Sequence, residues 1–257
     1  MWFINTRPQD RADNLTAALT AEGIRVKSLP LLELSACVWT PALATLYAEL
    51  PQADMVVVVS PTAVRIGMQY LQQAGISLQL LASVQWIAVG KATAQVLAEY
   101  GISSHVPEVE TSEGMLSLPL FQQTSVNTIA FWRGEGGRQF MMQHLQQQGV
   151  RILNFVLYQR VCPKETLTTW QEWLPILHQK PAPVWMLVTS EASWLNWLSL
   201  IDRDELPWSD FHFLVLGPRL SDLLQQADVP QPLHVLQLAN LQPETILQQI
   251  KVWQEEA

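Results

Sequence analysis

The sequence is poor in charge, and its few charged side chains do not gather into clusters of one sign. Only 15% of the 257 residues are Asp, Glu, Lys or Arg, and the formal net charge of −8 is spread along the chain. Proteins that bind nucleic acid use grouped Lys and Arg side chains, so we expect no nucleic-acid partner. Apolar runs such as 56–59 are far too short to cross a bilayer, so we expect no membrane association.

Cysteine is scarce too, with only the two residues Cys37 and Cys162. They cannot form a disulfide framework, and the chain starts without the charged and apolar regions of a signal peptide. We therefore expect a cytoplasmic protein with both thiols free, on neighbouring connector strands. The five histidines have no metal-ligand spacing to a cysteine, so the sequence predicts no metal site.

What the chain does have is a regular alternation of short apolar runs and amphipathic stretches, which is typical of βαβ units. The apolar runs are continuous, as in parallel strands covered on both faces. Ten strands exceed one tidy sheet, so we predict an α/β fold of two doubly wound parallel-sheet lobes, joined by the extended segments 29–38 and 155–163. The expected strands are 2–6, 25–29, 55–59, 85–89, 104–106, 128–132, 151–157, 184–188, 211–216 and 233–237. The expected helices are 10–22, 40–50, 61–73, 91–100, 112–122, 137–148, 165–178, 191–201, 218–227 and 243–255.

The pattern occurs twice along the chain. Arg7 and Arg133 each follow a short apolar run and precede a glycine by sixteen residues. Ser60 precedes Gly90 by thirty residues, and Ser190 precedes Gly217 by twenty-seven, in segments of similar character. In both copies, the small and polar residues lie where a strand ends and a helix begins, and ligands bind at that edge of open α/β sheets.

The candidate binding residues are small or cationic residues at these junctions. Free amides at helix N-termini bind carboxylates or phosphates, and hydroxyl or cationic side chains add further donors. The same residue types also cap helices, so the pattern leaves both interpretations open for each Ser and Thr. These candidates are Thr6, Arg7, Ser60, Lys91, Thr93, Arg133, Gly134, Ser190 and Arg219.

Two glycine-containing segments resemble nucleotide-binding motifs but do not have the residues or the spacing that these motifs require. The segment 89–93 has Gln85 where a P-loop needs glycine and Ala92 where it needs Ser or Thr. The segment 133–138 lacks the dinucleotide-binding spacing.

Tyr158 lies in the second connecting segment, where its hydroxyl could face a ligand or the ring could pack between strands.

Several segments occur in an order and spacing that are specific as a set. They are NTRP at 5–8, VVVVSPTAV at 56–64, IAVGKATAQVLAEYGI at 87–102, SEG at 112–114, the stretch from WRGEGG to VLYQR at 132–160, TS at 189–190, VLGPRLSDLL at 215–224 and PETILQQI at 243–250. With these segments, the chain resembles the uroporphyrinogen-III synthase family over essentially its whole length.

The resemblance implies an activity and assigns roles to residues. The family's enzymes are cyclising lyases of haem biosynthesis that convert hydroxymethylbilane to uroporphyrinogen III, with inversion of ring D and loss of water and with no metal or cofactor. Tyr158 matches the family's acid in its VY-x-R segment, and Thr93 matches its G-x-x-T threonine. The equivalent position in the other lobe is Leu220, a departure, so either Ser221 supplies that hydroxyl or the contact is absent.

The resemblance also implies how the chain is divided. Lobe 1 would consist of 1–34 and 164–257, and lobe 2 of 38–160, with a two-stranded β connector that hinges near 34–40 and 158–164. The family precedent favours a monomer that binds hydroxymethylbilane, with a transient contact with hydroxymethylbilane synthase. A non-catalytic two-lobed protein that closes on a small anion would share the fold and remains the alternative. A nucleotide-sugar transferase is usually longer and would need a nucleotide motif.

Overall fold

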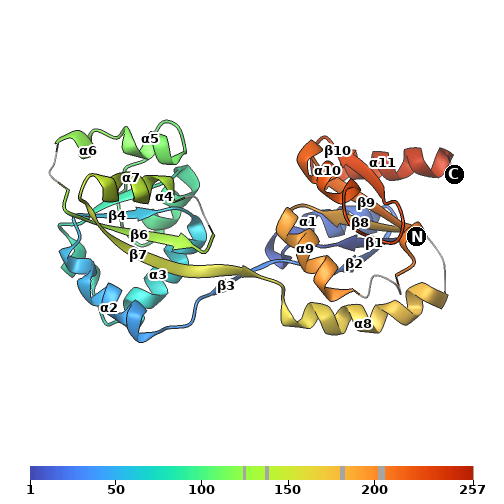
Figure 1. The fold of residues 1–257 in the computed structure, drawn as a ribbon, viewed down its shortest axis with the longest axis horizontal. Helices are drawn as coiled ribbons and strands as arrows, with labels where there is room; N and C mark the ends of the chain where they lie inside the picture. The colour runs from blue at the N-terminus through green and yellow to red at the C-terminus, as the bar shows by residue number, and fades with distance from the viewer. Residues whose placement is uncertain (124–125, 137–138, 180–182, 202–205, 257) are drawn as a thin grey trace. The chain divides into compact units, whose positions relative to one another are not determined.

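The computed structural model describes residues 1–123, 126–136, 139–179, 183–201 and 206–256. Contacts between residues divide the chain into two compact units (Figure 1). Unit 1 consists of Met1–Glu33 and Val161–Ala257, and unit 2 of Leu34–Arg160. Each unit contains a five-stranded sheet. The predicted α/β class with two parallel sheets is therefore confirmed.

The sheet of unit 1 has the strand order β10-β9-β8-β1-β2, and its strands run parallel. The strands are β1 (Trp2–Asn5), β2 (Arg25–Ser28), β8 (Val184–Val188), β9 (Phe211–Leu216) and β10 (His234–Leu238). The helices α1 (Gln9–Ala21) and α11 (Pro243–Glu256) cover one face. The helices α8 (Lys164–Gln179), α9 (Glu191–Leu200) and α10 (Pro218–Gln225) cover the other, together with the short helix η3 (Trp208–Asp210).

The sheet of unit 2 has the order β3-β7-β6-β4-β5. Its strands are β3 (Glu33–Ala36), β4 (Met55–Val58), β5 (Gln85–Ala88), β6 (Thr128–Gly134) and β7 (Arg151–Val161). One face packs on α2 (Pro41–Glu49), α3 (Pro61–Gln73), α4 (Lys91–Glu99) and the short helices η1 (Leu50–Gln52) and η2 (Leu78–Leu81). The other face packs on α5 (Ser112–Leu116), α6 (Leu120–Gln123) and α7 (Phe140–Gln147) (Figure 1).

Both sheets contain a point where the chain reverses the direction in which strands are added. In unit 1, β2 lies on one side of β1 and β8 on the other. In unit 2, β5 lies on one side of β4 and β6 on the other. In open α/β sheets, ligands bind at the carboxyl ends of the strands at such a point, so the strand order predicts one ligand position in each unit.

The differences from the predicted elements have local causes. The expected strand 104–106 is a single parallel bridge between His105 and Ile87. The expected helix 112–122 is divided into α5 and α6, because Pro119 lacks an amide hydrogen and its ring obstructs the carbonyl one turn before it. The helix expected at 137–148 begins at Phe140, and 137–138 lie outside the described residues.

The two connecting segments are neighbouring strands of one sheet, since β3 lies next to β7. The amide of Cys37, just after β3, donates to the carbonyl of Leu157 at 2.9 Å. Cys162 follows the end of β7, five residues beyond Leu157. Both thiols are free and half-buried, and burial raises the pKa of each.

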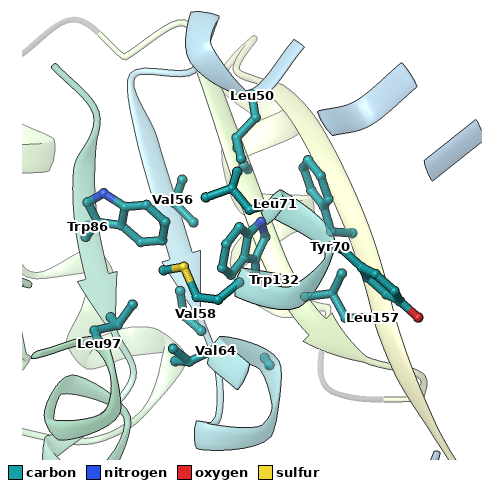
Figure 2. Packing of buried hydrophobic residues seen from close by; sticks show 14 of the residues in the cluster. Leu50, Val56, Val58, Val64, Tyr70, Leu71, Trp86, Leu97, Trp132 and Leu157 are labelled. Atoms are coloured by element: carbon teal, nitrogen blue, oxygen red, sulfur yellow. The ribbon is translucent and has the colours of Figure 1, made fainter. Parts of the chain in front are cut away.

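The core of unit 2 is built around Trp132 on β6, which is fully buried (Figure 2). Its ring meets that of Trp86 edge-on, with ring centroids 5.3 Å apart. On the helix side, α3 approaches so closely that a Cβ added to Gly67 would lie 2.2 Å from the Trp132 ring. Only glycine fits at this contact, which draws α3 onto the sheet next to the carboxyl end of β4.

In the described part of the chain, none of the helices combines the length and the apolar character needed to cross a bilayer.

His212 on β9 is the one described histidine that is buried, with 5% of its surface exposed. Its ring stacks on Trp185 with centroids 4.9 Å apart, and lies 4.5 Å from Trp253 and 5.1 Å from His234. Its Nδ1 has no hydrogen-bond partner among the described residues. Burial and then His234 lower its pKa, and Asp210 opposes them in part.

This lowered pKa predicts acid sensitivity. Below the ordinary pKa of 6.5, His212 binds a proton in the unfolded chain but stays neutral in the folded protein. The free energy of unfolding should therefore decrease as the pH is lowered. The slope for one group is at most about 1.4 kcal/mol per pH unit. Urea unfolding followed by tryptophan fluorescence between pH 7.5 and 5 would measure it. His212→Phe should flatten the slope, and His144→Gln, in unit 2, should not. An equal slope in the His212 variant would contradict the assignment.

Candidate functional site

A cavity of about 250 Å³ lies in unit 2. It begins where β4 and β6 end and where α3 starts, which is the ligand position that the strand order creates. Four predicted site residues from three separate segments of the chain line it together: Ser60, Arg133, Gly134 and Tyr158. The other lining residues are Val59, Val89, Ser112, Met115, Phe131, Met141, Met142 and Arg160.

The hydroxyl groups of Ser60 and Tyr158 lie 3.0 Å apart. Ser60 is the N-cap of α3, where its Oγ accepts the amide hydrogen of Ala63 at 3.1 Å. Pro61 occupies the first helical position, where its missing amide is no loss. The sequence pattern Ser-Pro-x-Ala therefore starts a helix and, at the same time, presents a hydroxyl at the end of β4.

Tyr158 reaches this position because of an irregularity in β7. Arg133 is paired with Val156, but Gly134 is paired with Tyr158, so Leu157 is an extra residue that shifts the register. Such a bulge redirects the side chains that follow it. The Tyr158 ring lies against Gly134, where an added Cβ would be 2.4 Å from Cε2 and 2.5 Å from Cζ. Gly134 is thus required for packing of the tyrosine ring.

The cavity has a cationic and an apolar part. Arg133 is 5% exposed, whereas Arg160 is exposed and its Nη1 donates to the carbonyl of Glu135 at 3.4 Å. None of the described residues that line the cavity is acidic. The apolar part consists of Val59, Val89, Met115, Phe131, Met141 and Met142. Such a cavity suits a ligand with a flat apolar body and acidic substituents, because thioethers pack well on aromatic rings and guanidinium groups bind carboxylates.

The N-terminus of α4, another expected anion site, already holds a carboxylate. The amide of Lys91 donates to Oε1 of Glu110 at 2.8 Å, and Gly90 leaves room for that carboxyl group. Thr93 is 2% exposed on the core side of α4, and it does not line the cavity.

The repeat-equivalent residues of unit 1 form a different surface. A more open cavity of about 650 Å³ lies beside the ends of β8 and β9, and its lining includes Ser190 and Arg219. Ser190 caps α9 through the amide of Ser193 at 3.1 Å. Arg219 forms an exposed ion pair of 2.8 Å with Glu191, and Asp222 also lines the cavity. The described lining of this cavity therefore contains two acidic residues, Glu191 and Asp222, whereas that of the unit 2 cavity contains none.

Three further candidates lie away from both cavities. Thr6 is fully buried and donates its hydroxyl to the carbonyl of Leu187, which ties β1 to β8. Ser221 is 8% exposed on the core side of α10. The amide of Arg7 donates to Oδ1 of Asn5 at 3.3 Å, and its side chain lines neither cavity.

The sequence analysis missed part of the cavity. Arg160 is the final residue of the segment that matches VY-x-R, so the family resemblance is a signal that could have indicated it. The three methionines gave no signal, because a methionine on a helix usually belongs to the core. Among the described residues, no group of three or more His, Cys, Asp or Glu could hold a metal ion.

Comparison with known proteins places this geometry in a family. The family model described as Uroporphyrinogen-III synthase HemD matches residues 13–233. Uroporphyrinogen-III synthase of Salmonella typhimurium is 31% identical over 166 residues, which are 64% of this chain and 66% of that protein. The Escherichia coli protein of the same name is 29% identical over 164 residues, 62% of this chain and 65% of that protein. The chain thus spans just under two thirds of the length of these two relatives.

Solved structures show the same fold. A mutant uroporphyrinogen III synthase of Thermus thermophilus aligns with a TM-score of 0.59 and 17% identity over 99% of both chains. The uroporphyrinogen-III synthetase of Helicobacter pylori aligns with a TM-score of 0.57 and 14% identity over 98% of both chains. Because the family model covers most of the sequence and these folds agree over nearly its whole length, the chain belongs to the uroporphyrinogen-III synthase family.

Proposed function

We propose that the protein converts hydroxymethylbilane to uroporphyrinogen III, in the haem pathway, with Tyr158 as the catalytic acid. The observation that carries the proposal is the cavity of unit 2, where the Tyr158 hydroxyl lies with two arginines and a methionine-rich wall. Family membership and the names of the similar proteins support the same reaction.

The chemistry of the substrate fits the lining of this cavity. Hydroxymethylbilane is a chain of four pyrrole rings that carries eight carboxylates. We infer that Arg133 and Arg160 hold carboxylates of one ring while Met115, Met141 and Met142 contact its face. The volume of about 250 Å³ lies below the roughly 300–1,000 Å³ of sites that enclose a drug-sized ligand, so we expect the cavity to hold part of the tetrapyrrole.

We assign the cavity to ring A, whose hydroxyl group departs. Tyr158 donates its proton to that hydroxyl as the C–O bond breaks, which releases water and leaves an azafulvene cation. Ring D then attacks through its substituted carbon, and a spiro intermediate rearranges to the inverted ring. The proton lost when the macrocycle closes returns to the tyrosine oxygen, so water is the net by-product. Most of the remaining catalysis is positioning of the two ends of the chain.

Among the other candidates, we propose that Ser190 and Arg219 bind substrate in the cavity of unit 1. The ion pair of Arg219 with Glu191 must open before Arg219 can hold a carboxylate. We propose that Lys91 binds substrate through its side chain, since its amide already donates to Glu110. The hydrogen bond of Thr6 to Leu187 favours a structural role for it, and burial favours packing roles for Thr93 and Ser221. Arg7 remains a proposal for binding through its side chain.

We further propose that the joints between lobes are shorter than the sequence suggests. Leu31 is fixed in unit 1, because its carbonyl accepts from Asn196 and its amide donates to Thr6. Cys37 is fixed in unit 2, because its carbonyl accepts from the Tyr70 hydroxyl. The strands β3 and β7 both belong to the sheet of unit 2. The bending residues are then Leu32, just before β3, and Cys162 and Pro163, just after β7.

The protein would work as a cytoplasmic monomer, with any contact with hydroxymethylbilane synthase transient. The two free thiols fit a reducing compartment.

The isomer ratio of the product tests the proposed activity. The protein should give mainly the type III isomer from hydroxymethylbilane, whereas the uncatalysed closure gives type I. Chromatographic separation of the oxidised products would measure the ratio, with heat-denatured protein as the control. A non-catalytic anion-binding protein, the alternative, would leave the type I outcome unchanged.

Tyr158→Phe should lower kcat by roughly 10²-fold, the low end for general acid catalysis, because a solvent proton can partly replace the phenol. The residual product should still be mainly type III, since the ring that shapes the cavity remains. Tyr100→Phe, at an exposed position in the same unit, is the matched control and should have wild-type kcat. A Tyr158→Phe protein with wild-type kcat would remove the catalytic assignment.

Arg160→Met should raise KM about fivefold with little change in kcat, since a partly exposed charge contact contributes up to about 1 kcal/mol. Arg65→Met removes an exposed arginine of the same unit that is paired with Glu99, and should leave KM unchanged. Steady-state rates at low and high ionic strength would measure KM, and the difference in KM between Arg160→Met and the wild type should be smaller at high salt, which screens the charge contact. Equal KM values for both variants would show that Arg160 does not bind the substrate.

A further inference from the structure

We propose that Ser60 is a positioning residue that donates a hydrogen bond to the Tyr158 oxygen and stabilises the charge that develops there during proton transfer. The inference rests on the proposed function and assigns Ser60 a role different from direct substrate binding. It follows from the hydrogen bonds that Ser60 forms and from the direction that proton donation by Tyr158 requires.

The first step concerns the hydrogen of the Ser60 hydroxyl. One lone pair of Oγ accepts the amide of Ala63 at 3.1 Å, so the hydroxyl hydrogen points elsewhere. Among the described residues, the other partner of Oγ is the Tyr158 oxygen at 3.0 Å. If Ser60 donates to this oxygen, the Tyr158 hydrogen is free to point into the cavity. If Tyr158 donates instead, its proton is directed away from any ligand.

The second step concerns charge. When Tyr158 gives up its proton, negative charge grows on the phenol oxygen, and a hydrogen bond donated to it becomes stronger. Ser60 is well suited for this, because it caps a helix of 13 residues whose N-terminus carries partial positive charge. The polarisation is passed on from the Ala63 amide through the Ser60 hydroxyl to Tyr158.

The third step concerns rigidity, because a donor helps only if its partner stays in place. Tyr158 is 4% exposed, its ring lies on the backbone of Gly134, and its carbonyl accepts the amide of Glu135 at 2.7 Å. Ser60 is held by the start of α3. The two hydroxyl groups therefore meet without reorganisation, which is what electrostatic stabilisation of a transition state requires.

Kinetics of Ser60 variants test the role. Ser60→Ala should lower kcat about tenfold and change KM less than twofold, because the donor acts on developing charge and not on bound substrate. Ser60→Thr keeps the hydroxyl and should restore most of kcat. In the Tyr158→Phe protein, Ser60→Ala should cause no further loss, since no phenol remains to be stabilised. Thr40→Ala is the matched control, because it removes the N-cap of α2 in the same unit and should leave kcat unchanged.

A spectroscopic measurement tests the hydrogen bond without relying on activity. The chain has four tyrosines, so labelling with 13C at Cζ gives four signals, and Tyr158→Phe assigns one of them. Ser60→Ala should shift that signal and Ser60→Thr should leave it near its original position. If the wild-type protein formed no type III product but the signal still moved, the pairing would stand and the proposed function would fail.

Two results would overturn the inference. A Ser60→Ala protein whose main defect is a raised KM would identify Ser60 as a direct substrate contact. An equal loss of kcat in the wild-type and Tyr158→Phe proteins would show that Ser60 acts independently of the phenol.

Discussion

The contact between the Tyr158 ring and the backbone of Gly134 is the constraint on which the candidate site depends. The ring can lie there only because residue 134 has no side chain and because Leu157 shifts the register of β7 by one residue. The close approach of α3 to Trp132, which Gly67 permits, brings the helix start to the same edge of the sheet. The phenol, a capping hydroxyl and two guanidinium groups are thereby gathered from three separate segments of the chain.

The two units show how a repeated architecture becomes functionally unequal. Both have a cavity at the carboxyl ends of their strands, beside β4 and β6 in unit 2 and beside β8 and β9 in unit 1, and both start a helix there with a capping serine. In unit 2 two arginines line the cavity, and none of the described residues that line it with them is acidic. In unit 1, Glu191 neutralises Arg219 and Asp222 adds a second negative charge. Recognition of a polycarboxylate should therefore depend more on unit 2.

The sequence predicted the elements well because their signals are local. Continuous apolar runs correctly predicted nine of the ten expected strands. The prediction of a strand at 104–106 was wrong, because this segment forms only a single bridge, between His105 and Ile87. The site was predicted only in part, because its formation depends on long-range packing. Whether a threonine such as Thr93 faces the core or a ligand, or whether Glu110 occupies a helix N-terminus, cannot be read from spacing. The bulge at Leu157 likewise has no sequence signature, although the tyrosine after it was recognisable from the family resemblance.

The central claim is that the reacting end of the tetrapyrrole binds beside Tyr158 in unit 2. A crystal structure with an unreactive bilane, in which a methyl group replaces the hydroxymethyl group of ring A, tests it most directly. The account predicts that this methyl carbon lies in van der Waals contact, at about 4 Å, with the Tyr158 oxygen, and that carboxylates of the same ring reach Arg133 or Arg160. A bound bilane whose ring A lies elsewhere, with no part of the molecule in the cavity of unit 2, would contradict the account.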